Sequence, residues 1–253
     1  MAKATQKRWT FRRREQIDQF WRSVRNVPTR RRRSKRDEER FCLGLYLLAL
    51  GTHEIVTYPV IVEEDESPDY MLSFGDSESV GLEVTKATTR QMQIDLTENE
   101  DEYERARKAS NGEPEPVGRL VSFEGLAGDS VETNWVKQIR DAIERKLKKL
   151  SKFRRAAHHD LLIYDDTPYG RGDWLVALRE VRKIVEKLRR GNSRLGKVSI
   201  IISLDVVLDV GGECRVLPFI NWSQPERTPD FARRVEHAAK KAAHDVLDQH
   251  ESR

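Results

Sequence analysis

The sequence has few cysteines and no long apolar run. Its 253 residues include 2 cysteines, Cys42 and Cys214, which cannot build a disulfide framework and lack the spacing of a zinc site. The longest apolar stretch, FCLGLYLLAL at 41–50, is too short to span a bilayer, and no secretory signal opens the chain. Phosphate-loop and dinucleotide-binding glycine patterns are also absent. These absences predict a soluble, cytoplasmic protein with no membrane partner.

Charge is abundant, and it is unevenly distributed along the chain. Residues 1–36 contain 14 Lys and Arg against 2 Asp and Glu, whereas residues 37–253 contain 32 against 40. A basic segment joined to a mildly acidic body favours a polyanionic partner, most simply nucleic acid. We therefore predict a basic arm over 1–35, flexible or forming a short helix, and a body over 36–253. The arginines expected to contact nucleic acid are Arg12, Arg13, Arg14, Arg30, Arg31, Arg32 and Arg33.

Within this arm, apolar residues recur at the spacing of one helix face. Ile17, Phe20, Trp21 and Val24 stand at i, i+3, i+4 and i+7, so a short amphipathic helix is expected. The alternative is a disordered, solubilising tail, which is how such charge runs usually behave. A further interpretation makes the arm a docking segment for an acidic partner protein.

The body alternates between helical and strand patterns. The elements expected between 37 and 166 are a helix at 37–50, strands at 53–64, 69–74 and 80–87, a helix at 131–156 and a strand at 160–166. Residues 91–130 are polar and acidic, and are expected to be an insertion. A helix at 174–190, strands at 197–207 and 214–222, and a last helix from Thr228 follow. This order predicts an α/β layer fold with a mixed central sheet flanked by helices.

The hairpin of 69–74 and 80–87 brings two carboxylates together. If Met71 stands opposite Glu83, then Asp69 and Glu83 are diagonal neighbours on one face, about 7–8 Å apart at Cα. Two carboxylates at this spacing can share one hard cation such as Mg²⁺. The other face of the hairpin is apolar, and it is expected to pack on the core.

The Pro68–Asp69 pair opens one strand, and Glu83-x-Thr85 follows in the next. This pattern resembles the motif of the PD-(D/E)XK nuclease superfamily, and the order αβββαβ over about 36–166 is that of its restriction-endonuclease-like fold. The resemblance covers about half of the chain. It implies a magnesium-dependent nuclease, with Mn²⁺ as a substitute, in which Asp69 and Glu83 bind the metal. The sequence leaves a homodimer open.

Two further positions of the family pattern fall on this chain. The acid that the family often takes from its first helix corresponds to Glu38 or Glu39. The family lysine stands two residues after the glutamate, where this chain has Thr85. Lys86 comes one residue later, and strand alternation turns it to the other face unless a bulge intervenes. The resemblance therefore implies either an inactive site or a lysine supplied from elsewhere.

Lys146 is the candidate for that lysine, because the superfamily can take it from a neighbouring helix. At about 100° per residue, Lys146 falls inside the apolar arc of the helix at 131–156. Burying an unpaired ammonium is costly, and the carboxylates of Asp69 and Glu83 would relieve that cost. The alternative is that Lys146 extends its ammonium into solvent along its methylene stem.

Other titratable groups give weaker signals. The pair His158–His159 precedes a strand and lacks a partner at metal-ligand spacing, so we expect it at a helix end or on the surface. Asp165–Asp166 ends a strand and is expected to begin a turn.

Two functions follow from the sequence. The first is magnesium-dependent hydrolysis of phosphodiester bonds, with DNA as the favoured substrate and with Asp69, Glu83 and Lys146 or Lys86 as catalytic residues. The alternative is a catalytically inactive nucleic-acid-binding module of the same fold, which the threonine at position 85 supports.

Overall fold

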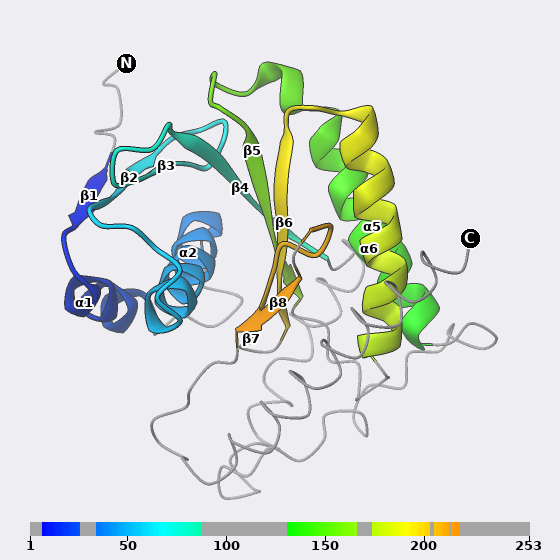
Figure 1. Cartoon of the computed structure of the whole chain (residues 1–253), viewed down its shortest axis with the longest axis horizontal. Coiled ribbons are helices and arrows are strands. Elements are labelled where there is room, and N and C mark those ends of the chain that lie inside the picture. The colour runs from blue at the N-terminus through cyan, green and yellow to red at the C-terminus, as the bar shows by residue number, and fades with distance from the viewer. Residues whose placement is uncertain are drawn as a thin grey trace, which may run out of the picture.

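The computed structural model describes residues 7–25, 34–87, 131–165, 174–202, 205–212 and 214–217. The described residues form one eight-stranded sheet with four α-helices (Figure 1). The predicted insertion at 91–130, the predicted helix from Thr228 and the arginines Arg30, Arg31, Arg32 and Arg33 lie outside the described residues.

The eight strands lie across the sheet in chain order. The helices are α1 (Arg14–Val24), α2 (Lys35–Thr52), α5 (Val131–Leu147) and α6 (Trp174–Gly191), with a 3₁₀ turn η2 at Leu150–Lys152. The strands are β1 (Arg8–Phe11), β2 (Val60–Glu64), β3 (Tyr70–Phe74), β4 (Val80–Lys86), β5 (His159–Asp165), β6 (Leu195–Ile202), β7 (Asp205–Leu208) and β8 (Arg215–Leu217). β4, β5 and β6 run parallel and the other neighbours antiparallel, which confirms the predicted α/β class with a mixed sheet.

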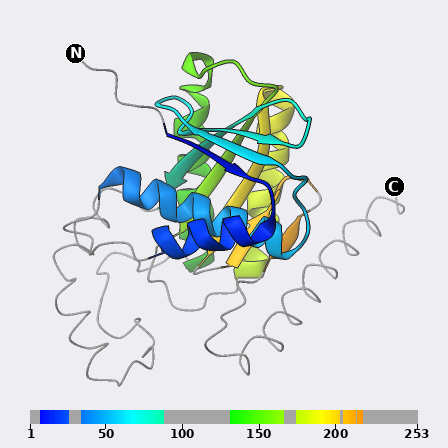
Figure 2. The same cartoon turned by 90° about the vertical axis from the view of Figure 1, so that its left-hand side faces the viewer.

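Helices cover both faces of the sheet (Figures 1 and 2). Leu82, Val84 and Leu162 belong to the apolar core shared with α1 and α2. Leu161 and Ile163, one residue out of phase, belong to the core shared with α5 and α6. β5 is therefore buried on both faces, which explains why its sequence is a continuous apolar run rather than an alternating one.

The first turn of α2 is fixed by a capping box at Ser34. The Ser34 hydroxyl accepts a hydrogen bond from the Asp37 N–H at 3.1 Å, and the Asp37 carboxylate accepts one from the Ser34 N–H at 3.0 Å. This fixed start of α2 places Lys35 and Glu39 on the helix face that is turned toward Asp69. Among the described helices, none combines the length and the apolar character that crossing a bilayer requires.

Residues 7–25 are built into the body, which corrects their description as part of a separate arm. β1 pairs antiparallel with β2, and the α1 predicted from apolar spacing is present, with Ile17, Phe20 and Trp21 buried. Arg12 and Arg13 remain exposed. The excess of positive charge wrongly predicted a separate arm, because the apolar residues between the arginines form one continuous stripe that a core can bury.

The hairpin register also differs from the prediction, by two residues. Met71 stands opposite Gly81 instead of Glu83, so Asp69 lies across from Glu83 rather than diagonal to it. The turn is longer than expected, because the end of β3 pairs with β2 and leaves β4. The Ser73 and Ser79 hydroxyls, 2.8 Å apart, bridge the widened loop.

Candidate active site

The second half of β4 has one open edge. β3 pairs with only the first three residues of β4, whereas β5 pairs with β4 as far as Lys86. On the open side, the Val84 N–H donates to Asp69 Oδ2 at 2.8 Å, and the Lys86 carbonyl accepts a hydrogen bond from Arg145 at 3.2 Å. Side-chain hydrogen bonds thus satisfy backbone groups that a neighbouring strand would otherwise pair. We call this open edge, residues 83–86, the notch.

Two buried carboxylates meet at the notch. Asp69 is 2% exposed and Glu83 is 5% exposed, and the Asp69 N–H donates to Glu83 Oε2 at 3.3 Å. Burial raises the pKa of Glu83, and the neighbouring negative charge of Asp69 raises it further. The structure therefore brings together the acid pair predicted from the sequence, at a site that disfavours the ionised form of Glu83.

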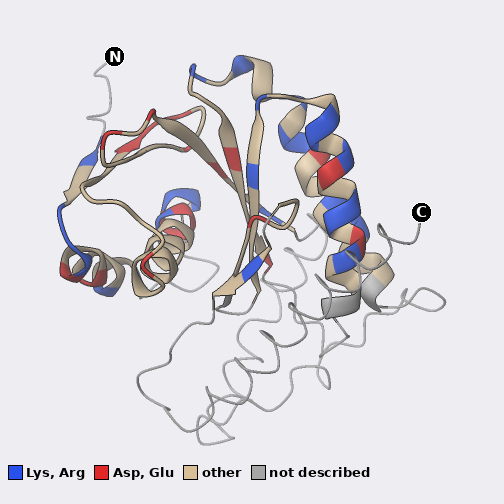
Figure 3. Cartoon of the chain, viewed as in Figure 1, with Lys and Arg blue, Asp and Glu red and all other residues tan. Residues whose placement is uncertain are grey.

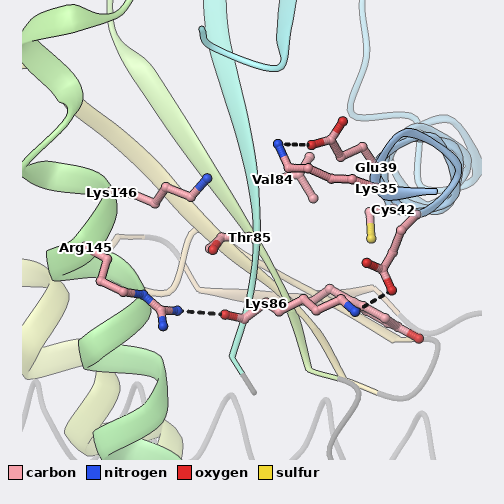
Figure 4. A pocket seen from close by; sticks show the side chains of 10 residues that line it. Lys35, Glu39, Cys42, Val84, Thr85, Lys86, Arg145 and Lys146 are labelled. Carbon is pink, nitrogen blue, oxygen red and sulfur yellow. Dashed lines mark hydrogen bonds and ion pairs between the residues drawn. The ribbon is translucent and has the colours of Figure 1, made fainter. Parts of the chain in front are cut away.

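Lys146 supplies a cation to this pair. Its ammonium, on the last turn of α5, donates to Glu83 Oε1, and its side chain is 16% exposed. This confirms that the helical arc turns Lys146 toward the sheet. Lys86 points to the other face and pairs with Glu38 of α2 at 2.6 Å, as strand alternation predicts (Figure 4). Thr85 points to the α5 side of β4, which is also the side from which Lys146 extends (Figure 4).

Glu39 and Lys35 form the α2 wall of the site. Burial, followed by the charge of Asp69, raises the pKa of Glu39 to about 7. Lys35 Nζ lies 2.7 Å from Glu39 Oε1 and 3.5 Å from Asp69 Oδ1. Burial lowers the pKa of Lys35, but the hydrogen bond with Glu39 and the charge of Asp69 outweigh it and raise that pKa. Lys35 was not predicted as a site residue, although the Lys-x-x-x-Glu spacing on a helix is a signal in the sequence.

A cavity of about 520 Å³ opens beside the notch, between α2 and α5. Its lining residues are Lys35, Glu38, Glu39, Cys42, Val84, Thr85, Lys86, Arg145, Lys146 and Tyr164 (Figure 4). The walls carry four cations and two acids, so the cavity favours an anionic ligand next to a buried carboxylate pair. Arg145 lines this cavity and was not predicted from the sequence.

The carboxylates fit a hard divalent cation as a pair. Within the described ranges, no three His, Cys, Asp or Glu side chains form a group that could hold a metal ion. Mg²⁺ needs fewer protein ligands, because it is held by one or two carboxylates together with waters and substrate oxygens. Asp69 and Glu83 provide such a pair. Glu39, expected as a further ligand, lies near Asp69, with the Lys35 ammonium 2.7 Å from Glu39 Oε1 and 3.5 Å from Asp69 Oδ1, and its role as a ligand stays a prediction.

The other sequence candidates lie apart from the acid pair. Arg13 pairs with Glu15 at 3.7 Å on the surface of α1. His159 is fully buried at the start of β5, so the expectation of a surface or helix-end position is wrong for this residue. Its strand begins one residue earlier than predicted, because His159 pairs with Leu195 of β6, and its ring packs against Phe153 at 5.4 Å between ring centroids.

Comparisons with protein-family models, with curated proteins and with solved structures find no match. The resemblance to PD-(D/E)XK nucleases therefore rests on Pro68–Asp69, on Glu83 and on the order of the elements. The functional interpretation rests on the geometry of the notch.

Proposed function

We propose that this chain is a metal-dependent nuclease that hydrolyses phosphodiester bonds, with DNA as its substrate, and that its fold is of the restriction-endonuclease-like type. The observation that carries the proposal is the notch itself. Two buried carboxylates, Asp69 and Glu83, lie at an open strand edge, and a lysine from the facing helix reaches one of them. Burying like charges together is unfavourable for stability, and such arrangements concentrate at functional sites.

The residues divide the chemistry in the following way. Asp69 and Glu83 would hold Mg²⁺ or Mn²⁺, which when bound supplies a Lewis acid for the phosphodiester and lowers the pKa of water. Lys146 holds its ammonium at Glu83 Oε1, where it can orient a water molecule or stabilise charge on the phosphate. Arg145, which lines the cavity beside the notch, adds positive charge for the non-bridging phosphate oxygens.

Lys146 takes the place of the strand lysine in this proposal. The position two residues after Glu83 is Thr85, which cannot supply a positive charge. Lys146 approaches the same side of β4 from α5 (Figure 4). The departure from the family motif is therefore compensated in space by a residue that is distant in the sequence.

The test is cleavage of supercoiled plasmid with and without Mg²⁺. We expect the wild-type protein to cleave in Mg²⁺ and to be inactive in EDTA. Glu83→Gln should lower the rate at least about a hundredfold, because it removes charge at the reacting centre while keeping the volume of the side chain. Glu180→Gln is the control, since Glu180 is an exposed acid of α6 that pairs with Lys183 and does not line the cavity, and it should retain cleavage.

A nucleic-acid-binding module without catalysis is the second candidate. The ion pairs of Lys35 with Asp69 and of Lys146 with Glu83 favour it, because both engage the carboxylates that a metal would need. If the wild-type protein binds DNA but leaves plasmid intact in both Mg²⁺ and Mn²⁺, the binding module is the correct function.

A further inference from the structure

A second cationic region lies outside the arm and adjoins the cavity, whose lining includes its first two residues, Arg145 and Lys146. Residues 145–158 contain 7 Lys and Arg and no acid, and residues 187–197 contain 5 and no acid. The first segment runs from the last turn of α5 to the start of β5. The second runs from the last turns of α6 into β6. We call the two segments together the basic end.

The two segments are neighbours in space. The His159 N–H, directly after the first segment, donates to the Arg194 carbonyl at 2.9 Å. A Cβ on Gly196 would overlap the ring of His158, so the His158 side chain packs directly against the Gly196 backbone. Both lie at the end of the molecule where α5 and α6 finish and β5 and β6 begin, and Figure 3 shows lysine and arginine gathered there.

The exposed cations of the basic end differ from those along the middle of the helices. In mid-helix, Arg182 pairs with Glu186 at 3.0 Å, and Lys183 pairs with Glu180 at 2.8 Å. Among the described residues, no carboxylate lies within ion-pair distance of the four exposed side chains Lys148, Lys149, Lys152 and Arg155.

Arg154 is the member of this run that is paired, with Asp65 at 3.2 Å and Glu63 at 3.7 Å. Interaction with helix dipoles accounts for cations in the last turn of a helix, such as Arg145 and Arg190. It does not account for the residues of 148–155, which follow the end of α5. Four unpaired cations in eight residues repel one another, and a polyanion would relieve that repulsion.

We propose that the basic end binds the phosphate backbone of DNA without reading its sequence, and that it leads the backbone to the notch. The continuity is structural, because the Lys149 N–H donates to the Lys146 carbonyl at 2.9 Å, and residues three apart in a helical turn are neighbours. The delivery step rests on the proposed nuclease function. The binding step does not, and it holds equally for a binding module.

The test measures binding of a short fluorescein-labelled duplex in EDTA as the salt concentration is varied. The basic-end variant carries Lys148→Gln, Lys149→Gln, Lys152→Gln and Arg155→Gln. Each lost phosphate contact flattens the slope of log affinity against log salt by about 0.9, so we expect a flattening of about 3 to 4 with weaker binding throughout. Circular dichroism and the thermal midpoint should match those of the wild type, because all four side chains are exposed.

The matched control removes the same charge from the middle of the helices. It carries Lys137→Gln, Arg140→Gln, Arg179→Gln and Lys183→Gln, all at exposed positions. The control should keep the wild-type slope. An unchanged slope in the basic-end variant, or an equal flattening in the control, would overturn the proposal. Because metal is absent, failure of cleavage in the plasmid assay does not affect this outcome.

Discussion

The notch and the start of β5 lie on paired strands, and both bury titratable groups, but they differ in packing and in charge. At the start of β5, Asp160 accepts a hydrogen bond from the Lys197 N–H at 2.6 Å, and His159 Nε2 accepts one from Arg194 at 3.1 Å. A Cβ on Gly81 would overlap the His159 ring, so this region has no spare volume. The notch instead borders a cavity of about 520 Å³.

The charges differ as well as the packing. Burial, followed by Arg194 and His158, lowers the pKa of His159 to about 4, so the folded protein keeps this imidazole neutral at pH 7. Beside the notch, the pKa of Glu39 is raised to about 7, and the side chain of its partner Lys35 is 76% exposed. A tightly packed histidine that is held neutral serves stability. Crowded carboxylates held by an exposed lysine beside a cavity are the arrangement that a cationic ligand can reorganise.

The largest expected effect concerns the two lysines near the notch. If the notch is catalytic, Lys146→Met should lower the cleavage rate by about 10² to 10³, because it removes a preorganised charge at the reacting centre. Lys86→Met should change the rate little, since Lys86 pairs with Glu38 on the other face. Single-turnover cleavage measures both.

A double variant sharpens this contrast. Thr85→Lys together with Lys146→Met returns the lysine to the strand, on the side of β4 that faces α5. We expect it to recover part of the lost rate. The reverse order for the single variants, with Lys86 the more important, would contradict the placement of Lys146.

The pH dependence of stability should distinguish the two regions by sign. An unfolded histidine takes up its proton near its ordinary pKa of 6.5, whereas folded His159 resists until about 4. His159 therefore lowers the free energy of unfolding by about 3 kcal/mol as pH falls from 6.5 to 4. Urea unfolding in EDTA should show that His159→Gln loses less stability than the wild type over this range.

Glu39 should give the opposite slope. Its folded pKa of about 7 lies above the ordinary 4.5, so the folded state holds the extra proton and loses stability as pH rises from 4.5 through 7. Relative to the wild type, Glu39→Gln should gain up to about 3 kcal/mol over that rise. Parallel curves for Glu39→Gln and wild type would show that Glu39 is not held protonated by burial.

A methyl group added at a glycine should be tolerated at one position and not at another. A Cβ on Gly81 would overlap His159 Nδ1 and lie 2.9 Å from Pro68 Cγ, whereas Gly191 has nothing within 4 Å of its added Cβ. Gly81→Ala should therefore destabilise the protein by about 1–3 kcal/mol, as overpacking does. Gly191→Ala is the control and should not destabilise it. Equal thermal midpoints for the two variants would mean that the region around His159 is not tightly packed.

The smallest effect concerns Lys35. If Asp69 helps to hold a metal, the Lys35 ammonium 3.5 Å away competes with it. An exposed ion pair is worth at most about 1 kcal/mol, so Lys35→Met should tighten Mn²⁺ binding about fivefold, as measured by electron paramagnetic resonance. Lys183→Met, which removes an equally exposed cation paired with Glu180, should leave the affinity unchanged. Weaker binding in Lys35→Met would show that the lysine supports the metal site instead of competing for it.

Local patterns predicted much of the fold. The order α2, β2, β3, β4, α5, β5 follows from apolar periodicity, and Lys146 was found because helical spacing alone places it among apolar residues. The strand at 53–64 was overextended, since only Val60–Glu64 is paired, and β1 was missed entirely. A four-residue strand among arginines has too short a pattern to recognise without its partner β2.

The sequence by itself determined which residue types could meet near β4, because alternation along a strand and the arc of a helix are properties of the local chain. These local patterns correctly predicted that Lys86 points away from the acid pair and that Lys146 points toward it. Only the tertiary structure decided that β3 leaves β4 early, that Asp69 satisfies the freed Val84 N–H, and that Lys35 reaches the carboxylates. Those features depend on how a loop closes and on which strand pairs with which, and register is set by contacts between residues far apart in the chain.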